Sequence, residues 1–503
     1  MACYLYDRLT AQGASDGIFL ETPGGRALSY GQVALLSAQI AHALKDCGTK
    51  AGDIVAVQIE KSPEAVMLML ACLRVGAVFL PLNTAYTASE IAYFLGDSHP
   101  RVFVCDPSRA GELTSIATAA HVAHVLTLDS AGQGSLMERA ADQPKDFENA
   151  VRGADDLAAL LYTSGTTGRS KGAMLTQDNL ASNAQTLCDT WHFSSRDVLL
   201  HALPIYHTHG LFVAINVTMM AGAKLLFLPK FDADQIISLM PQATCLMGVP
   251  TFYTRLIEHP GLTAEAVKPM RLFISGSAPL LAETHRIFAQ KTGMAILERY
   301  GMTETGMITS NPYQGARRAG TVGLPLADVE VRVCDPTDGH PMPQGDIGVI
   351  EVRGPNVFKG YWEMPEKTAA EFRKDGFFIT GDLGLVDGEG YVHIVGRGKD
   401  LVITGGFNVY PKEVESEIDA LEGVQESAII GLPHRDFGEA VTAVIVLEKG
   451  ANLDEAQVLA ALAPKLAKFK LPKKVIFASE LPRNTMGKVQ KNRLRDMFSA
   501  TYG

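Results

Sequence analysis

The sequence predicts an α/β protein with a large N-terminal domain of parallel-rich sheets and helices, followed by a small mobile α+β domain. Short apolar strands alternate with helical stretches through most of the chain, which is typical of parallel sheets. After about residue 320 the texture changes, because Gly and Asp turns become frequent. A length of 503 residues exceeds what one core supports and suggests about three domains or subdomains.

Composition and charge exclude several classes of protein. The formal net charge of −10 argues against non-specific binding to nucleic acid. The seven cysteines lie far apart and form no C-x-x-C pair, which indicates a reducing compartment and no structural zinc. No signal or transit peptide is visible. We therefore expect a cytoplasmic protein, a monomer or weak homo-oligomer, that binds neither nucleic acid nor membranes.

The N-terminal third is expected to contain a buried strand at 54–59, then a helix and a second strand. The run 66–82 is the most apolar of the chain, but Arg74 and Gly76 interrupt it, so it falls short of a membrane span. Residues 62–64 supply an N-cap serine, a proline at the first helical position and an acid in the first turn. The run therefore predicts a buried helix followed by a buried strand.

The middle of the chain repeats this alternation. Strands are expected at 101–105, 157–163, 271–275 and 295–301. Pro279 can open a helix soon after the third of these strands. Ligands bind at the carboxyl ends of strands in such sheets. The loops that follow three of the strands, at 163–172, 276–279 and 301–305, are therefore expected to converge on one crevice.

The final part of the chain reads as a separate unit. Strands near 320–395 look short and antiparallel, and they belong to the N-terminal domain, which we place at 1–398. The boundary at about Lys399 leaves 399–503 as the small domain. That domain is expected to hold a hairpin, a helix from Pro411, two strands, a helix around 453–467, a further strand and a tail.

The stretch YTSGTTGRSKG, at 162–172, is suited to binding phosphate, because it combines glycines, small hydroxyls and two cations. It is not a P-loop. The second glycine of that motif would fall at 170 or 173, which hold Ser170 and Ala173. The dinucleotide fingerprint G-x-G-x-x-G is also absent here. Taken alone, such a loop is more often a plain connection.

Six motifs together resemble the adenylate-forming enzymes, a superfamily of acyl-CoA synthetases, non-ribosomal adenylation domains and luciferases. In chain order they are YTSGTTGRSKG, LPIYHTHG (203–210), ERYGMTET (298–305), ITGD (379–382), GRGKDLVITGGFNVYP (396–411) and PRNTMGK (482–488). The resemblance covers nearly the whole chain. It implies that a carboxylate attacks the α-phosphorus of ATP, and that a thiol then displaces AMP from the acyl-adenylate. The implied cofactors are ATP, Mg²⁺ and coenzyme A.

The resemblance also implies roles for individual residues at the nucleotide. Ribose contacts fall to Asp382 and Arg397, magnesium contacts to Thr163 and Glu304, and a position near the α-phosphate to Thr303. Adenine is enclosed by 276–279 and 299–302, and the β- and γ-phosphates are held by 163–171. The implied ATP site comprises Thr163, Ser164, Gly165, Thr166, Thr167, Gly168, Arg169, Ser170, Lys171, Gly276, Ser277, Ala278, Pro279, Arg299, Tyr300, Gly301, Met302, Thr303, Asp382, Arg397 and Lys488.

The mobile domain contributes catalysis in this family. Lys488 matches the lysine that bridges the α-phosphate and the attacking carboxylate, where its charge offsets the charge of the transition state. Lys399 matches the hinge. Gly405 and Gly406, in the loop after it, would line the pantetheine channel. This sequence ends at Gly503, fifteen residues after Lys488, which favours a diffusible acceptor, CoA, over a fused carrier domain.

The acid is inferred from ERYGMTETGM and SGSAPLLAETHRIF, which most resemble malonyl-CoA and methylmalonyl-CoA synthetases. A dicarboxylate brings a charged distal group into the acyl pocket, and a buried carboxylate needs a cation. Arg286 is the expected cation, although a surface arginine is an even alternative. His209 and Ser277 are the expected donors. The pocket is expected to be bounded by Thr208 and Met307, with His207 at the gating position.

Three readings remain open at this point. The first is a dicarboxylate–CoA ligase. The second is a ligase for short- or medium-chain fatty acids or aryl acids, in which Arg286 would be exposed. The third is a nucleotide-binding regulator without catalysis, which an intact Lys488 disfavours. Acyl-CoA synthetases that resemble this chain are often silenced by acetylation of that lysine, so an acetyltransferase and a deacetylase are expected partners.

Overall fold

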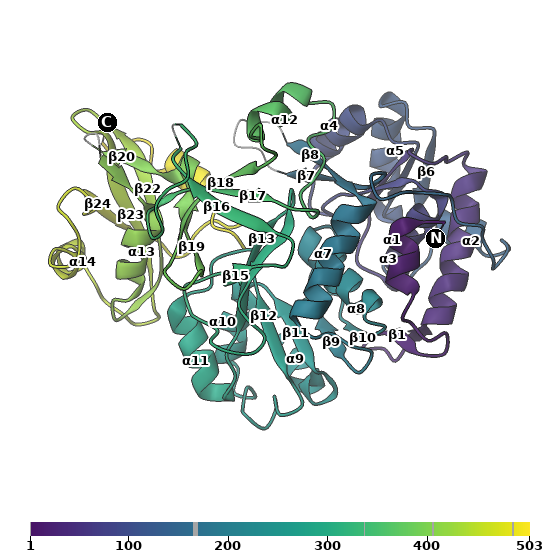
Figure 1. The fold of residues 1–503 in the computed structure, drawn as a ribbon, viewed down its shortest axis with the longest axis horizontal. Helices are drawn as coiled ribbons and strands as arrows, with labels where there is room; N and C mark the ends of the chain where they lie inside the picture. Colours follow the sequence, from purple (N-terminus) through teal and green to yellow (C-terminus); the bar gives the residue numbers. More distant parts are fainter. Residues whose placement is uncertain (1, 164–169, 337, 405–406, 485–486, 503) are drawn as a thin grey trace.

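The chain folds around four β-sheets (Figure 1). The structure is a computed structural model and describes residues 2–163, 170–336, 338–404, 407–484 and 487–502. Two large sheets build most of the N-terminal part, a four-stranded sheet follows them, and a five-stranded sheet carries the C-terminal part. Mixed α/β architecture with parallel-rich sheets was predicted from the sequence and is confirmed.

The nine-stranded sheet is parallel through its centre and antiparallel at both edges. Its order is β15 (Leu324–Pro325), β14 (Gly306–Ser310), β13 (Leu297–Met302), β12 (Leu272–Ser275), β11 (Cys245–Gly248), β9 (Val198–His201), β10 (Lys224–Phe227), β1 (Ile18–Glu21) and β2 (Ala27–Ser29). Its central strands are almost wholly buried, which explains their unbroken apolar sequences.

The six-stranded sheet carries the glycine-rich loop. Its order is β6 (His124–Thr127), β5 (Val102–Cys105), β3 (Ile54–Gln58), β4 (Val78–Pro81), β7 (Leu157–Thr163) and β8 (Lys171–Thr176). All its neighbours are parallel except the β7–β8 pair, which is antiparallel. The loop between β7 and β8 is therefore a hairpin connection at the edge of the sheet.

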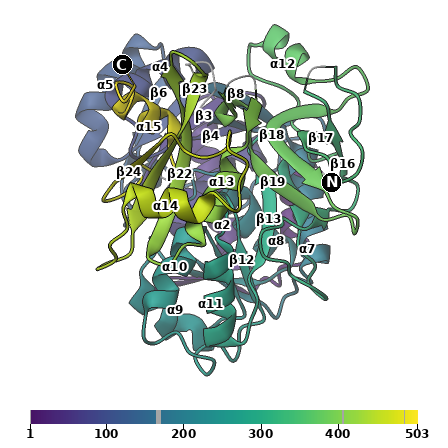
Figure 2. The same cartoon turned by 90° about the vertical axis from the view of Figure 1, so that its left-hand side faces the viewer.

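The two remaining sheets lie toward the C-terminus. The four-stranded sheet is antiparallel and has the order β16 (Glu330–Cys334), β17 (Gly348–Arg353), β18 (Phe378–Val386) and β19 (Val392–Arg397). The last sheet joins β21 (Phe407–Val409), β20 (Val402–Thr404), β23 (Gly438–Leu447) and β22 (Val424–His434), with β24 (Lys474–Phe477) parallel to β23. Figure 2 shows this C-terminal sheet and its helices in front of the rest of the chain.

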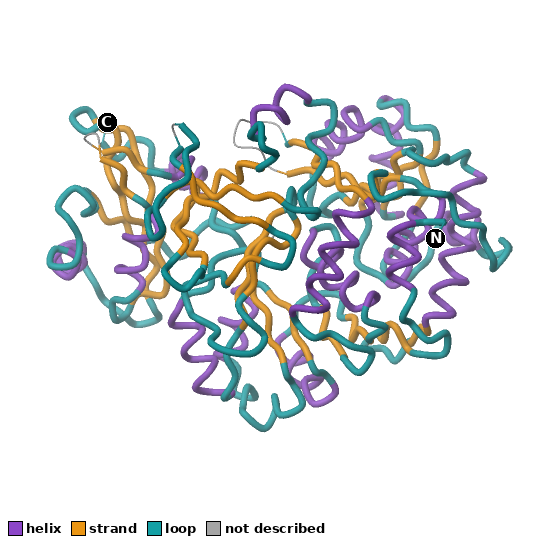
Figure 3. The backbone as a smooth tube through the Cα atoms, viewed as in Figure 1, coloured by secondary structure: helices purple, strands orange, loops and turns teal. Residues whose placement is uncertain are grey.

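Helices pack against the sheets, some on the outside and some in the interior (Figure 3). In the N-terminal part they are α1 (Tyr4–Thr10), α2 (Tyr30–Asp46), α3 (Pro63–Val75), α4 (Ala88–Ser98), η1 (Pro107–Arg109), α5 (Ala110–Ala119), α6 (Ser135–Ala140), α7 (Gln177–Thr190), η2 (His209–Ile215), α8 (Asn216–Met220), α9 (Ala233–Leu239), η3 (Met240–Gln242), α10 (Pro250–Glu258), α11 (Ala282–Thr292) and α12 (Pro365–Glu371). Beyond them lie η4 (Gly398–Asp400), α13 (Pro411–Asp419), α14 (Glu455–Leu462) and α15 (Lys491–Met497).

Helix α3 confirms the expected buried helix, since each of its residues is buried. The Ser62 hydroxyl accepts a hydrogen bond from the backbone N–H of Ala65, and Gly76 ends the helix in the left-handed conformation at φ +82°. None of the described helices is both long and apolar enough to cross a membrane.

The helix after β12 begins later than predicted. Pro279 was expected to open it, but α11 starts at Ala282. Its buried residues are Thr284, His285, Phe288 and Thr292, which form one stripe. This placement decides which residues of α11 can face the interior.

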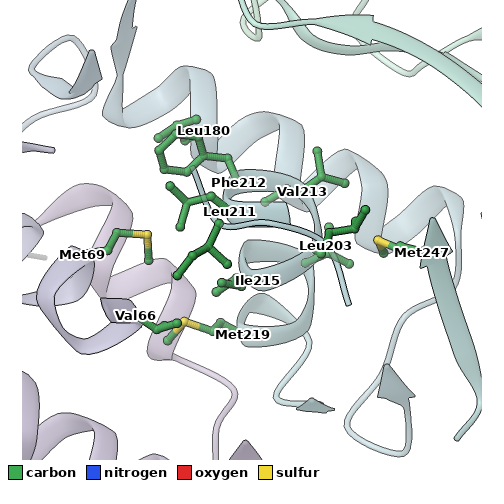
Figure 4. Packing of buried hydrophobic residues seen from close by; sticks show 14 of the residues in the cluster. Val66, Met69, Leu180, Leu203, Leu211, Phe212, Val213, Ile215, Met219 and Met247 are labelled. Atoms are coloured by element: carbon green, nitrogen blue, oxygen red, sulfur yellow. The ribbon is translucent and has the colours of Figure 1, made fainter. Parts of the chain in front are cut away.

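A π-helix, η2, lies at the centre of the largest apolar core (Figure 4). Its residues Leu211, Phe212, Val213 and Ile215 are buried among side chains of α3, α7 and α8. The π-helical stretch is uncommon and is frequent near functional sites. It begins at His209, so the apolar core fixes one side of a segment whose other side carries candidate site residues.

Candidate active site

The two large sheets meet where β7 and β13 end. The hydroxyl of Thr163, the last residue of β7, donates to the Glu304 carboxylate at 3.2 Å. Glu304 follows β13, which belongs to the other sheet. The structure therefore brings together two of the expected loop regions, and the crevice lies between sheets rather than over one of them.

Glu304 is a buried carboxylate held by hydroxyl groups. Tyr361 donates to its Oε1 at 3.3 Å and to Glu371 at 2.6 Å, and Lys171 pairs with Glu371 at 3.0 Å. Burial raises the pKa of Glu304, and no ion pair to it is found among the described residues. A hard cation would stabilise this oxygen cluster, so Thr163 and Glu304 fit a Mg²⁺ site that is completed by phosphate and water.

Replacing Glu304 with Gln is expected to raise the Mg²⁺ concentration at half-maximal turnover about 10- to 100-fold, because the site loses its negative ligand. A Mg²⁺ titration at saturating ATP measures this. Glu366→Gln on the exposed face of α12 is the matched control and should behave as the wild type. Identical Mg²⁺ curves for both variants would contradict the assignment.

Asp382 and Arg397 lie opposite one another in the β18–β19 pair. Arg397 Nε is 2.6 Å from an Asp382 carboxylate oxygen, and the Tyr300 hydroxyl donates to the other oxygen. Although desolvation opposes it, the Asp382 charge raises the pKa of Arg397. Asp382 is buried, and its carboxylate can accept hydrogen bonds from both hydroxyls of a ribose. One of these hydroxyls could replace Tyr300 as the donor.

Lys488 from the C-terminal part faces the same crevice. The residue is exposed overall, but its ammonium lies close enough to Arg397, Asp382 and Glu304 to be affected by their charges. Desolvation within the crevice and then the charge of Arg397 lower its pKa, while Asp382 and Glu304 act in the opposite direction. The ammonium of Lys488 thus feels the charges of the candidate ribose and metal groups, although more than 80 residues separate it from Arg397 in the sequence.

The segment 201–210 leads into η2 and carries His207, Thr208 and His209. Burial lowers the pKa of His207 to about 4, and burial followed by the charge of Arg299 lowers the pKa of His209. Both imidazoles are therefore neutral near pH 7. Ser277 Oγ lies 3.2 Å from His209 Nδ1, and the Ser277 backbone has φ +72°, which is strained for a residue with a side chain.

Arg299 is the most unusual side chain of the site. It is 3% exposed, and its Nε and Nη2 have no hydrogen-bond partner among the described residues. Desolvation lowers its pKa to about 9, so it stays charged at pH 7. A Cβ on Gly276 would lie 2.4 Å from the Arg299 Cζ, which explains the glycine there. A buried guanidinium without an acceptor is costly and fits a site that takes an anion.

Several other buried polar atoms of the 207–209 segment and of β12 and β13 also lack partners. They are His207 Nε2, Thr208 Oγ1, His209 Nε2, Ser275 Oγ and Glu298 Oε2. These atoms are drawn from the described part of the chain only. Such a group of unsatisfied donors and acceptors is rare in a native interior and indicates a place for a polar ligand.

A cavity of about 10 Å³ lies behind this group. Thr208, Thr303 and Gly306 are among the residues that line it. It has room for about one water molecule or methyl group. Met307 is buried beside it, and Asn183 hydrogen-bonds both its backbone groups, at 2.9 and 3.0 Å. Space for no more than a small group therefore remains beside Thr208 and Met307.

Arg286 is exposed in this structure, and its expected role as the cation for the acid stays a prediction. Its side chain is 54% exposed and forms an ion pair with Glu283 one turn earlier. The buried stripe of α11 includes His285 and Phe288 but leaves Arg286 on the opposite face. The position of this stripe on the helix accounts for the orientation of Arg286.

Some predicted residues are not brought into this description. Ser164, Gly165, Thr166, Thr167, Gly168, Arg169, Gly405 and Gly406 lie outside the described residues. Lys399 lies in η4, between the four-stranded sheet and β20. Gly276, Ala278 and Pro279 form the loop after β12, and Gly301 and Met302 end β13. Their expected contacts with adenine remain predictions.

Sequence reasoning missed three features of the site. Tyr361 and Glu371 connect the metal candidates to Lys171, yet neither lies in a recognised motif. The motif placed Arg299 at adenine, and the structure adds that its guanidinium lies beside Gly276 and influences the pKa of His209. An arginine after a run of apolar strand residues was the available signal, because a buried strand seldom carries a charge.

Comparison with known proteins matches both parts of the chain. Residues 8–362 match the family model of AMP-binding enzymes, and residues 413–488 match the model of their C-terminal domain. The feruloyl-CoA synthase of Amycolatopsis sp is 36% identical over 94% of this chain and 95% of its own length. The malonate–CoA ligase of Arabidopsis thaliana is 34% identical over 96% of this chain and 87% of its own.

Solved structures of similar proteins also resemble this chain in conformation. ATP-bound MatB from Rhodopseudomonas palustris is 60% identical, matches with a TM-score of 0.98 and is covered over the full length of both chains. The apo form of that protein matches with a TM-score of 0.87, again over both full lengths. The arrangement described above is therefore more like the nucleotide-bound form than the free form.

Proposed function

Because this chain belongs to the AMP-binding enzyme family, whose members include acyl-CoA ligases, we propose that it is an ATP-dependent malonyl-CoA or methylmalonyl-CoA synthetase. A dicarboxylate and ATP would form an acyl-adenylate and pyrophosphate. CoA would then displace AMP to give the acyl-CoA. The general activity, ligation of an acid to a thiol, follows from the family, whereas the choice of a dicarboxylate rests on the site.

The observation that carries this choice is Arg299. A monocarboxylic acid would place an apolar chain against a buried, unpaired guanidinium, which would leave the charge unsatisfied. A dicarboxylate brings a second carboxylate that an arginine can bind with two parallel bonds. His209 and Ser277, bonded to each other at 3.2 Å, stand beside the arginine as further donors. The small cavity near Thr208 has room for about one methyl group and so leaves no space there for a long chain.

The reacting end of the acid would lie toward Lys488. Asp382 and Arg397 would orient the ribose, and the 163–171 loop would hold the β- and γ-phosphates. Lys488 would then meet the α-phosphate and the attacking carboxylate, and its charge would offset the charge that develops there. Mg²⁺ held by Thr163 and Glu304 would neutralise phosphate charge.

The second half-reaction requires access for a thiol. We assign residues 399–503 to a mobile unit that turns about Lys399 once the adenylate has formed. The 405–408 loop would then face the pantetheine arm of CoA. Asp400, next to Lys399, is bonded to Arg495 of α15 at 2.6 Å, a contact that would change with the turn.

Turnover of four acids tests the proposal. Pyrophosphate release is measured with malonate, methylmalonate, acetate and hexanoate at saturating ATP and CoA. We expect kcat/KM for either dicarboxylate to exceed that for either monocarboxylate at least about 100-fold, since sites built for a polar group strongly reject analogues that lack it.

The outcome also separates the proposal from its alternative. The feruloyl-CoA synthase relative is as similar in sequence as the malonate–CoA ligase relative, so an aryl or fatty acid is the second candidate. Faster turnover of hexanoate than of malonate would favour that candidate and contradict the role given to Arg299. Release of no pyrophosphate with any acid would favour a binding protein without catalysis.

Acetylation of Lys488 would remove the charge that adenylation needs. Stoichiometric acetylation at this position, introduced as acetyl-lysine during translation, is expected to lower adenylation to the level of an alanine variant. Treatment with a deacetylase should restore it. Full activity in a sample that mass spectrometry shows to be completely acetylated would exclude regulation by this route.

A further inference from the structure

Lys61 is a buried lysine without an acidic partner among the described residues. It is 8% exposed and follows β3. Its Nζ lies 2.7 Å from His201 Nδ1, 2.8 Å from the His201 carbonyl and 3.0 Å from the Leu203 carbonyl. It also stands 4.3 Å from the centre of the Phe227 ring. Neutral dipoles and a ring face therefore hold this group in place of a carboxylate.

Counting hydrogen bonds shows that Lys61 and His201 together carry one positive charge. His201 Nε2 lies 2.8 Å from the Gly210 carbonyl, which can only accept, so Nε2 holds a proton. The two carbonyls near Nζ take two of its protons. The third contact, between Nζ and Nδ1, needs one more proton, on either atom. Burial lowers the pKa of both His201 and Lys61 well below their usual values, so the pair shares this one charge across the Nζ–Nδ1 contact.

These contacts link the start and the end of the 201–210 segment to each other through Lys61 and His201. Lys61 holds the carbonyls at its start, residues 201 and 203, and His201 holds the carbonyl at its end, Gly210. Between them lie His207 and His209. A Cβ on Gly210 would be 2.0 Å from the Pro204 carbonyl oxygen, so the turn is as tight as a glycine permits.

The π-helix depends on the same closure. Leu211 donates to the His207 carbonyl at 3.0 Å, which begins the helical bonding immediately after the turn. The apolar side chains of η2 fix its inner side (Figure 4), and His209 is its first residue. The polar contacts of Lys61 and His201 are the ones that reach the backbone on both sides of His207 and His209.

We propose that Lys61 is a positioning residue for acid binding, which acts through His201 and Gly210 to orient His209 toward the acyl pocket. The proposal rests on the proposed function, because it assumes that an acid occupies the site beside His209. It assigns Lys61 no contact with substrate. Loss of Lys61 should let the 201–210 segment relax, and a displacement of about 1 Å at a reacting group can cost about 100-fold in rate.

The first test compares Lys61→Met, Lys61→Arg and Lys224→Met. Lys224 pairs with Glu21 across β10 and β1, away from the crevice, and serves as the control. We expect Lys61→Met to raise KM for the acid about 10- to 100-fold with KM for ATP changed less than about twofold. Lys61→Arg should recover part of the loss, since it restores a buried charge with several donors.

The second test separates the contact of His201 Nδ1 with Lys61 from the hydrogen bond of His201 Nε2 to Gly210. In His201→Asn the amide oxygen can replace Nδ1 as acceptor for Lys61, but nothing reaches Gly210. In His201→Gln the amide nitrogen can replace Nε2 as donor to Gly210, but the bond to Lys61 is lost. We expect the asparagine variant to show the larger rise in KM for the acid, because the Gly210 carbonyl lies next to His209.

These outcomes are independent of the identity of the acid, since each variant is assayed with whichever acid the wild type uses best. Preference of the wild type for hexanoate would overturn the proposed function and leave the Lys61 test intact. Equal changes in KM for acid and ATP, or an equal fall in Tm and activity without a change in KM, would show that Lys61 only stabilises the fold. An unaltered KM in Lys61→Met with native Tm would overturn the proposal outright.

Discussion

Replacing Lys488 with alanine is expected to lower the rate of acyl-adenylate formation about 100- to 1,000-fold, the usual cost of removing one group that stabilises transition-state charge. The ammonium lies in the crevice and responds to the charges of Arg397, Asp382 and Glu304. Acid-dependent exchange of labelled pyrophosphate into ATP measures this half-reaction without CoA. Binding of ATP, followed by calorimetry, should change little, because Asp382 and the phosphate loop remain.

The control for this variant is Lys449→Ala, which removes an exposed lysine on the turn after β23 in the same part of the chain. It should exchange pyrophosphate at the wild-type rate. Lys488→Arg keeps a charge but presents it as a wide planar group, so we expect it to stay impaired. Wild-type exchange in Lys488→Ala would show that another group provides the charge.

Replacing Arg299 with methionine is expected to raise KM for malonate about 100- to 1,000-fold, because the distal carboxylate would lose the buried cation that we propose for it. KM for ATP should stay near the wild-type value if the guanidinium serves the acid and not the adenine. Steady-state kinetics with malonate and butyrate measure both effects. The ratio of kcat/KM for butyrate to kcat/KM for malonate should therefore rise.

Arg286→Gln is the matched control, since this arginine is exposed and pairs with Glu283. We expect it to retain wild-type kinetics with malonate. The reverse result, a large loss in Arg286→Gln and none in Arg299→Met, would return the role to the residue that the sequence suggested. It would also require α11 to turn its outer face toward the crevice when substrate is bound.

The Arg299 variant should also be more stable than the wild type in the absence of substrate. The unpaired guanidinium costs free energy that methionine, which is similar in length and apolar, does not. A higher Tm together with lost malonate turnover is the pattern of a residue kept for function at the expense of stability. It further shows that lost activity does not come from unfolding.

The nucleotide half of the site was largely accessible from the sequence. Thr163 and Glu304 lie in short motifs at or just after strand ends, where α/β sheets bind ligands, whereas Asp382 and Arg397 lie opposite each other in an antiparallel pair. The motifs also fixed their order and spacing. What they could not give is that Thr163 and Glu304 come from different sheets, since sheet membership depends on strand pairing far apart in the chain.

The part of the site that is expected to bind the acid was harder to predict from the sequence. The role of Arg286 or Arg299 depends on which face of α11 is buried and on whether a guanidinium finds a partner, and neither can be read from a motif. The same holds for Lys61, which is 140 residues from His201 in the sequence and has no acidic neighbour to mark it. Packing decides these features, and packing is the level that local sequence patterns describe least.

A structure of the protein with a non-hydrolysable malonyl-adenylate tests the central claim most directly. We predict that both oxygens of the distal carboxylate lie within hydrogen-bond distance of the Arg299 guanidinium, with His209 and Ser277 alongside and Lys488 at the phosphate. A distal carboxylate that points to solvent or pairs with Arg286, with Arg299 still unpaired, would contradict the account.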